Sequence, residues 1–178
     1  GVKKPMVSYY EHNIRARGEE IVGRILAGES CAVVTDAGMP CISDPGEDLV
    51  RLCREREVAI EVVPGPSAVI AALAVSGLPP SRFSFEGFLS TTRKNRLAHL
   101  EEIRQMRHTL VFYEAPHKLL TTLQDLREGL GDRRVALCRE LTKLHEEVVR
   151  TTFSGALEHY ADHSPKGEYV LVVEGYTP

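Results

Sequence analysis

Apolar and polar residues along the first part of the chain predict a helix followed by a strand. Apolar positions recur at three- and four-residue spacing with charges between them, which predicts an amphipathic helix over residues 11–26 that ends at Gly28. A short β-branched run over residues 32–35 predicts a strand. The next twelve residues, DAGMPCISDPGE, are rich in Gly, Pro and Asp and can continue neither element, so they predict a long loop at the end of the strand.

The same order then repeats. A helix is predicted over residues 47–56, a strand over residues 59–63, a tight PGPS loop, and an apolar helix over residues 68–75 that closes at Gly77. Strand and helix alternating at this spacing predict parallel strands joined by right-handed crossovers. Ligands of open α/β sheets bind beyond the carboxyl ends of such strands, where both Gly- and Pro-rich loops fall.

After Pro80 the pattern changes to more strands and fewer helices. Strands are predicted over residues 83–88, 109–114, 134–141, 148–154 and 168–174. Helices are predicted from the basic segment TTRKNR to Met106, after Pro116 over residues 119–126, and over residues 156–161. Several adjacent strands predict a mixed sheet. The chain is therefore expected to be an α/β protein of two domains, residues 1–79 and 80–178, with the boundary near residues 78–81.

Composition supports a folded protein without a membrane span. The chain has 178 residues, of which 43% are hydrophobic and 26% charged. Its longest apolar stretch, residues 68–75, is too short to cross a bilayer, and residues 5–13 are polar where a signal peptide would be apolar. We therefore expect a cytoplasmic protein with no membrane association. The net charge of −3 gives no global attraction to nucleic acid, so any RNA contact has to come from a local basic patch.

The cysteines and histidines do not predict a metal site. The four cysteines are irregularly spaced and contain no CxxC pair, which argues against zinc binding and against a disulfide framework. We expect reduced and mostly buried thiols. The seven histidines also lack metal-ligand spacing.

Two loops carry the clearest candidate chemistry. In VVTDAGMPCISDPG, backbone amides and carboxylates could bind a ribose or an ammonium group, although a solvated turn is the better guess for either DAG or DPG alone. In VVPGPSAVIAAL, Ser67 is placed to cap a helix whose exposed amides favour a polar or anionic group, but an ordinary turn is again an alternative. The absence of GxGxxG and GxxxxGK[ST] removes the usual support for nicotinamide cofactors and NTP hydrolysis.

Six ordered blocks make a family resemblance specific. They are TDAGMPCISDPG, VVPGPSA, SGLPPSRFSFEGFL, TLVFYEAPHKLL, RVALCRELTKLHEE and KGEYVLVVEG. In this order they resemble the ribosomal RNA small-subunit methyltransferase I family of the tetrapyrrole methylase superfamily, which methylates the 2′-hydroxyl of a cytidine in the decoding region. The resemblance covers essentially the whole chain.

The resemblance implies a fold, a cofactor and partners. It implies two α/β domains with S-adenosylmethionine in the cleft between them, a homodimer, and small-subunit ribosomal RNA or the 30S particle as substrate. The residues implied to line the cofactor from the first part of the chain are Asp36, Ala37, Gly38, Met39, Pro40, Ile42, Ser67 and Ala68. The residues implied for the opposite wall are Tyr113, Glu114, Ala115, Thr142 and Glu174.

The chain departs from the family pattern in two places. Met39 stands where the family usually has the threonine of a Gly-Thr-Pro triplet, which removes a hydroxyl from the loop. The family also begins with a strand and a TPIGNL-type loop before the segment that corresponds to Gly1. We therefore expect a fragment that lacks the first βα unit and one wall of the substrate cleft.

Substrate and catalytic residues are predicted from the later blocks. Arg93, Lys94 and Arg96 form a basic cluster at a helix start that could contact phosphates, although a solvated helix face is an equal alternative without the resemblance. His117 is a candidate RNA contact or a helix-start residue. Glu140 and Lys143 could orient or deprotonate the ribose hydroxyl, and a structural ion pair at a strand end is the alternative.

Methyl transfer from a sulfonium requires alignment of the acceptor oxygen with the methyl carbon and no metal. Two rival interpretations stay open. The chain could belong to a superfamily enzyme that methylates a tetrapyrrole or another small molecule. It could also be a truncated chain that dimerises or binds RNA without turnover.

Overall fold

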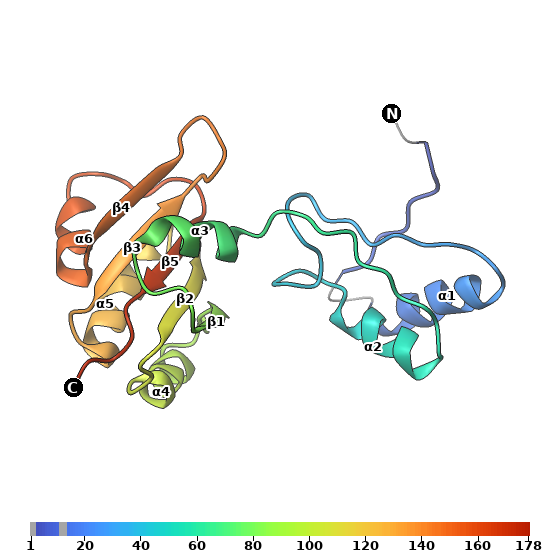
Figure 1. Ribbon diagram of the computed structural model, residues 1–178, viewed down its shortest axis with the longest axis horizontal. Coiled ribbons are helices and arrows are strands. Elements are labelled where there is room, and N and C mark those ends of the chain that lie inside the picture. Colours follow the sequence, from blue (N-terminus) through green and yellow to red (C-terminus); the bar gives the residue numbers. More distant parts are fainter. Residues whose placement is uncertain (1–2, 11–13) are drawn as a thin grey trace. The chain divides into compact units, whose positions relative to one another are not determined.

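The structure is a computed structural model that describes residues 3–10 and 14–178. The chain folds as two compact units, Gly1–Pro66 and Ser67–Pro178, which we call unit 1 and unit 2. Figure 1 shows unit 1 in blue to teal and unit 2 in green to red. The described residues contain six helices and five strands, and none of these helices is long and apolar enough to span a bilayer.

Unit 1 is built around two helices. Helix α1 (Ile14–Leu26) packs against α2 (Glu47–Glu55). Apolar positions spaced by three and four residues face each other, as the sequence pattern predicts. The buried core between the helices is formed by Ile21, Val22, Leu49 and Cys53. Both helices are confirmed, except that the predicted first residues 11–13 of α1 lie outside the described part of the chain.

The two strands predicted for unit 1 are not formed. Residues 32–35 and 59–63 have no ladder hydrogen bonds, and no β-strand occurs among the described residues of unit 1. Their valines lie in water: Val34 is 73% exposed and Val63 86%. A strand needs a hydrogen-bonded neighbour, which a β-branched sequence alone does not supply. The predicted parallel pairing in this half of the chain is therefore wrong for this structure.

Unit 2 contains a five-stranded mixed sheet in the order β1-β2-β5-β3-β4. Strands β1 and β2 pair in parallel, and the other pairs are antiparallel, which confirms the predicted mixed sheet. The strands are β1 (Phe83–Phe88), β2 (Thr109–Glu114), β3 (Arg134–Arg139), β4 (Glu147–Thr152) and β5 (Tyr169–Val173). The bounds of β1 and β2 agree with the prediction, and the other three strands are shorter than predicted.

Both faces of this sheet are covered by helices. Three helices pack on one face through a large apolar core that includes Leu100, Phe112 and Leu123. They are α4 (Arg93–Ile103), α5 (Leu119–Leu130) and α6 (Phe153–His159). The other face is packed by α3 (Ala68–Ser76), which contacts β5, β3 and β4. Because side chains alternate between the two faces of a strand, each central strand contributes to both cores.

Three details of unit 2 differ from the expectations. Helix α3 folds with the sheet of unit 2, so the units divide after Pro66, whereas the sequence places a domain boundary near residues 78–81. Pro116 precedes α5 by a turn instead of lying in its first turn. Helix α6 begins at Phe153, earlier than predicted, because the Thr152 hydroxyl accepts a hydrogen bond from the Gly155 amide and caps the helix.

Candidate functional site

The first Gly- and Pro-rich loop has an unusual backbone. Between Asp36 and Gly46 two non-glycine residues, Cys41 and Ser43, have φ values of 70° and 60°. A Cβ atom added to Gly46, where φ is 144°, would lie 2.4 Å from the Cys41 sulfur. Left-handed non-glycine residues are costly and concentrate at ligand sites, so this loop is the first candidate for a binding site in unit 1.

The second loop lies directly against the first. The Gly65 amide donates a hydrogen bond to the Met39 Sδ atom over 3.2 Å. A Cβ atom on Gly38 would lie 3.2 Å from the carbonyl oxygen of Pro66. The two glycine–proline turns therefore lie side by side within unit 1. Sequence reasoning treated Met39 as a lost hydroxyl, whereas its polarisable sulfur is an acceptor that ties the loops together.

Polar groups on these loops are open to water. Asp36, Ala37, Gly38 and Ile42 are exposed, and Met39 is half-buried. An exposed carboxylate can accept hydrogen bonds from hydroxyl or ammonium groups, and the neighbouring glycine amides can donate hydrogen bonds to anionic groups. Burial and the nearby carboxylates of Asp44 and Glu47 raise the pKa of the Cys41 thiol, which keeps it protonated.

Ser67 opens α3 without capping it. The residue occupies the N-cap position with an extended backbone, but its side chain makes no capping hydrogen bond. The predicted cap is therefore wrong, although the predicted position at the helix start is confirmed. Ala68 is the first residue of α3 and is exposed.

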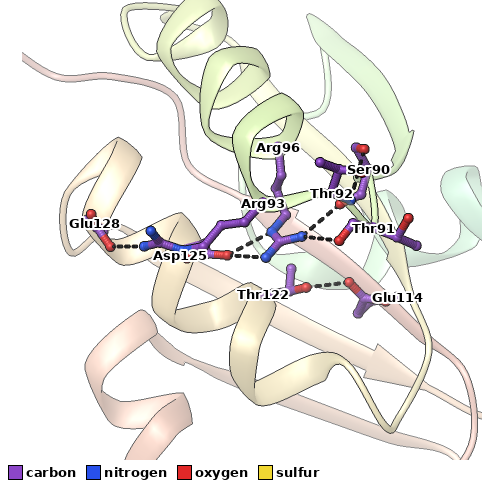
Figure 2. A network of polar contacts seen from close by, with 9 residues as sticks. All are labelled: Ser90, Thr91, Thr92, Arg93, Arg96, Glu114, Thr122, Asp125 and Glu128. Atoms are coloured by element: carbon purple, nitrogen blue, oxygen red, sulfur yellow. Dashed lines mark hydrogen bonds and ion pairs between the residues drawn. The ribbon is translucent and has the colours of Figure 1, made fainter.

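At the carboxyl end of β2, the Glu114 side chain is directed into unit 2. The residue is 4% exposed, and its carboxylate accepts hydrogen bonds from the Thr122 hydroxyl at 2.5 Å and the Ala115 amide at 2.7 Å. Figure 2 shows the bond to Thr122 on α5. Glu114 thus fixes the chain that follows β2. Its neighbour Tyr113 projects from the opposite face of the sheet and is half-buried.

The loop between β3 and β4 contains the predicted catalytic pair. Lys143 Nζ lies 3.0 Å from Glu140 Oε1, and Glu140 and Thr142 both have positive φ values, 49° and 67°. The hydrogen bond from Lys143 holds the pKa of Glu140 below its ordinary value. A carboxylate with a lowered pKa is a weaker base, so this geometry favours the structural ion pair over proton abstraction.

Glu174 lies apart from the other predicted cofactor residues of unit 2. Strand β5 runs antiparallel to β2 and pairs Tyr169 with Glu114, so the residue after β5 falls at the opposite end of the sheet. There the Glu174 carboxylate accepts from Arg134 Nε at 2.9 Å. The sheet therefore brings Tyr113, Ala115 and the β3–β4 loop to one end and leaves Glu174 at the other.

The predicted RNA-binding residues fall into two groups. Arg96 is 8% exposed and is bonded to Asp125 at 2.6 Å and to the Ser90 carbonyl at 2.7 Å. Arg93 is bonded to Asp125 and Glu128 (Figure 2). Arg96 is therefore a buried tie between α4 and α5, and not part of the basic surface that the sequence predicts. Lys94 and His117 are exposed and available to phosphates.

The cysteines are free thiols in different environments. Cys53 and Cys138 are buried, Cys41 is half-buried and Cys31 is exposed, so the expectation of mostly buried thiols is met by two of the four. Burial raises the pKa of Cys138 to about 11. No three His, Cys, Asp or Glu side chains converge on a possible metal position in residues 3–10 and 14–178.

Comparison with known proteins decides the family. Residues 2–156 match the tetrapyrrole (corrin/porphyrin) methylases. The chain belongs to this family. The match covers all of unit 1 after Gly1 and most of unit 2, and it includes both Gly- and Pro-rich loops.

Curated relatives place this tetrapyrrole methylase more closely. A Thermotoga maritima protein is 45% identical over 174 residues, which cover 98% of this chain and 78% of that protein. A Synechocystis protein is 45% identical over 99% of this chain, and the match spans 64% of its length. Both relatives are named ribosomal RNA small subunit methyltransferase I. The chain thus spans less than two thirds of the Synechocystis relative.

Solved structures confirm the fold. The methyltransferase CobJ superposes with a TM-score of 0.68 at 20% identity, over 96% of this chain and 74% of CobJ. A uroporphyrin-III C-methyltransferase from Thermus thermophilus, solved with S-adenyl homocysteine, gives 0.60 at 18% identity over 92% of this chain and 74% of that one. The α/β tetrapyrrole-methylase-like fold class is therefore confirmed, although the predicted strands of unit 1 are absent.

Proposed function

We propose that the protein is an S-adenosylmethionine-dependent methyltransferase that modifies the ribose 2′-hydroxyl of a cytidine in small-subunit ribosomal RNA. The observation that carries this proposal is the 45% identity to the Thermotoga maritima ribosomal RNA methyltransferase over 98% of the chain. A cytoplasmic location and a homodimeric active unit belong to the same proposal. The 30S particle is the proposed partner.

The loops of unit 1 fit the chemistry of S-adenosylmethionine. The exposed Asp36 carboxylate suits ribose hydroxyls or the ammonium group, and the glycine turns held together by Met39 offer close backbone approach. When bound, the cofactor supplies an activated methyl group on its sulfonium. The proposed cofactor contacts of unit 1 are Asp36, Ala37, Gly38, Met39, Pro40 and Ile42.

The residues of unit 2 that were predicted to contact the cofactor are proposed to have different roles. Ser67, Ala68, Tyr113, Ala115 and Thr142 stay predicted cofactor contacts. The Glu114 carboxylate is occupied by Thr122 and Ala115, which supports a role in fixing the chain after β2 rather than in touching the cofactor. Glu174 is bonded to Arg134 at the other end of the sheet, which favours a structural role.

The protein contributes mainly by positioning the acceptor oxygen. Holding two reactants in line can supply a large part of a rate enhancement, and methyl transfer to a hydroxyl needs its proton removed only late. Lys94 and His117 are the proposed exposed phosphate contacts, with Arg93 partly neutralised by its carboxylate partners. The Glu140–Lys143 pair is proposed to hold the β3–β4 loop beside the substrate.

A methyl-transfer assay on 30S particles tests the function. Particles that lack the modification are incubated with the protein and methyl-labelled S-adenosylmethionine, and the RNA is hydrolysed with alkali. A 2′-O-methyl group protects its own phosphodiester bond, so label is expected in an alkali-resistant dinucleotide that contains cytidine. Label on a base, or transfer to a precorrin-type tetrapyrrole and not to the particles, would contradict the proposal.

Cofactor binding is tested by calorimetry with a matched pair of variants. Asp36→Ala removes the exposed carboxylate of the first loop, and Asp162→Ala removes an exposed carboxylate of unit 2. The affinity for S-adenosylmethionine is expected to fall by about tenfold or more in the first variant, because a charge-assisted hydrogen bond is lost, and to stay unchanged in the second. Equal affinities in both variants would remove Asp36 from the site.

A further inference from the structure

Strand β1 contains a bulge that sets the direction of an aromatic side chain. Phe85 pairs with Val111, Gly87 with Phe112 and Phe88 with Tyr113, so Glu86 is an extra residue in the ladder. In a regular strand, residues three apart face opposite sides of the sheet. The extra residue brings Phe88 back to the face of Phe85, and Gly87 with φ 64° accommodates the bend. Bulges of this kind often re-aim a side chain next to a functional site.

Three rings meet on this face, and we call Phe85, Phe88 and Tyr113 the aromatic cluster. The Phe85 and Tyr113 ring centroids are 4.9 Å apart at 68°, and those of Phe88 and Tyr113 are 5.6 Å apart at 63°. Both are edge-to-face contacts, which are favourable and hold the rings in place. Phe88 is nevertheless 58% exposed. Most of a large apolar ring therefore remains in water beside two half-buried ones.

The chain segments that follow β1 and β2 carry exposed polar side chains, among them a lysine and a histidine. Strands β1 and β2 are parallel, so their carboxyl ends, with Phe88 and Tyr113 as direct neighbours, share one edge of the sheet. The segments that leave this edge carry Lys94 in the first turn of α4 and His117 and Lys118 before α5. Lys94 and His117 are exposed. An exposed ring at the end of the sheet from which the segments with Lys94 and Lys118 continue suits a ligand that combines a flat apolar face with phosphate charge.

We propose that Phe88, supported by Tyr113 and Phe85, stacks on an unpaired base of the RNA substrate. This inference rests on the proposed function, which supplies the RNA. Proteins that recognise single-stranded RNA stack its splayed bases on aromatic side chains and hold its backbone with cations. An enzyme that modifies a nucleotide within folded RNA gains from such a platform because it holds the flanking chain in an open conformation.

Equilibrium binding of a short single-stranded RNA, measured by fluorescence anisotropy, tests this site. Phe88→Ala is expected to weaken binding by about tenfold or more, the effect of losing one base–aromatic stack. Phe88→Trp keeps a flat ring and is expected to retain the affinity. Phe83→Ala is the matched control, because Phe83 is a partly exposed phenylalanine of the same strand, 39% exposed, at its other end. It is expected to bind RNA like the unmodified protein, and melting temperatures show that all variants fold.

Several results would overturn the stacking site. Phe88→Ala with unchanged RNA affinity would do so, as would an equal loss in Phe83→Ala. A loss of S-adenosylmethionine affinity without a loss of RNA affinity would assign the ring to the cofactor. Dissociation of a dimer in Phe88→Ala, seen by sedimentation, with RNA affinity retained would assign the ring to a second copy of the chain.

Methyl transfer to 30S particles separates this inference from the proposed function. If the unmodified protein methylates the particles but Phe88→Ala binds RNA as tightly as it does, the proposed methyltransferase activity is supported and the stacking site is ruled out. If RNA binding depends on Phe88 but the unmodified protein transfers no methyl group, the stacking site is supported and the proposed methyltransferase activity is ruled out. An unmodified protein that does not bind the oligonucleotide overturns the site directly.

Discussion

Units 1 and 2 contain apolar, β-branched segments of the same kind in opposite environments. In unit 2, β5 is paired on both sides, and Leu171, Val172 and Val173 are fully buried. In unit 1, residues 32–35 and 59–63 are unpaired, and Val63 is 86% exposed. The difference shows that side-chain type favours an extended backbone but that burial depends on a neighbouring strand.

The two units also differ in the size of their cores. Four buried residues hold α1 and α2 together in unit 1, whereas two large clusters cover both faces of the sheet in unit 2. The loops that we propose to bind the cofactor belong to the unit with the smaller core. Ligand binding stabilises the state that binds it, so the cofactor is expected to order and stabilise unit 1 more than unit 2.

Hydrogen exchange measured by mass spectrometry is expected to show the largest contrast. Amides of residues 32–35 and 59–63 should exchange almost as fast as in an unfolded chain, whereas those of β2 and β5 should be slower by several orders of magnitude, about the range between local and global opening. S-adenosylmethionine should slow exchange in residues 36–46 and at the Gly65 amide, and should leave β5 unchanged. Comparable protection of the amides in both units would contradict the difference in stability that we infer between unit 1 and unit 2.

Removal of a buried charge should destabilise unit 2 strongly. Asp125 is 3% exposed and bonded to Arg96 and Arg93, so Asp125→Ala leaves the Arg96 guanidinium buried without its carboxylate. The free energy of unfolding is expected to fall by about 3–5 kcal/mol in chemical denaturation. Glu128→Ala removes the exposed partner of Arg93 and should cost under about 1 kcal/mol. Similar losses in both variants would contradict the buried tie between α4 and α5.

A smaller loss of stability is expected when the hydrogen bond to Glu114 at the end of β2 is removed. Thr122→Val keeps the shape of the side chain but removes the hydroxyl that donates to the buried Glu114 carboxylate. The free energy of unfolding should fall by about 1–3 kcal/mol, the cost of an unsatisfied buried polar group. Thr121→Val, at an exposed neighbouring position, is the control and should have little effect. An equal change in both variants would show that Glu114 does not depend on Thr122.

The smallest expected effect on stability is the pH dependence caused by the ion pair between Glu174 and Arg134. The hydrogen bond from Arg134 holds the pKa of Glu174 below its ordinary value. A lowered pKa in the folded state gives stability that is present above the unfolded pKa of about 4.3 and is lost as the pH falls through the folded pKa. Glu174→Gln should therefore lower the melting temperature slightly at pH 7, and the difference should disappear in acid. A difference that persists below the folded pKa would contradict this origin.

Sequence patterns predicted unit 2 well because its strands are recognisable locally. The continuous apolar run of β2 is buried on both faces of a covered sheet, and its bounds agree with the prediction. Residues 59–63 carry the same signal, but pairing depends on a partner strand that local sequence cannot specify. Helices α1, α2 and α5 were predicted for a related reason, since their periodicity is contained in the segment itself.

The candidate site was predictable only in part. Glycines and prolines located both loops of unit 1, but nothing in the sequence indicated that the Met39 sulfur joins them. Arg96 belongs to a basic run, and its burial depends on Asp125, which lies 29 residues further along the chain. Glu174 was grouped with Glu114 by resemblance, whereas the antiparallel direction of β5 separates them. Contacts between residues far apart in the sequence therefore determine the role of each side chain, and the spacing of residues along the chain does not reveal these contacts.

The bulge in β1 makes position 86 unusually tolerant of a change in chain length. Glu86 has no partner in the ladder, so removal of its codon would leave Phe85, Gly87 and Phe88 opposite the same residues of β2. The contact between Glu86 and His99 would be lost, but the rings would keep their face. Related chains with a one-residue gap here are expected to present the same aromatic surface, whereas an added residue elsewhere in the strand would turn Phe88 toward the face covered by α4, α5 and α6.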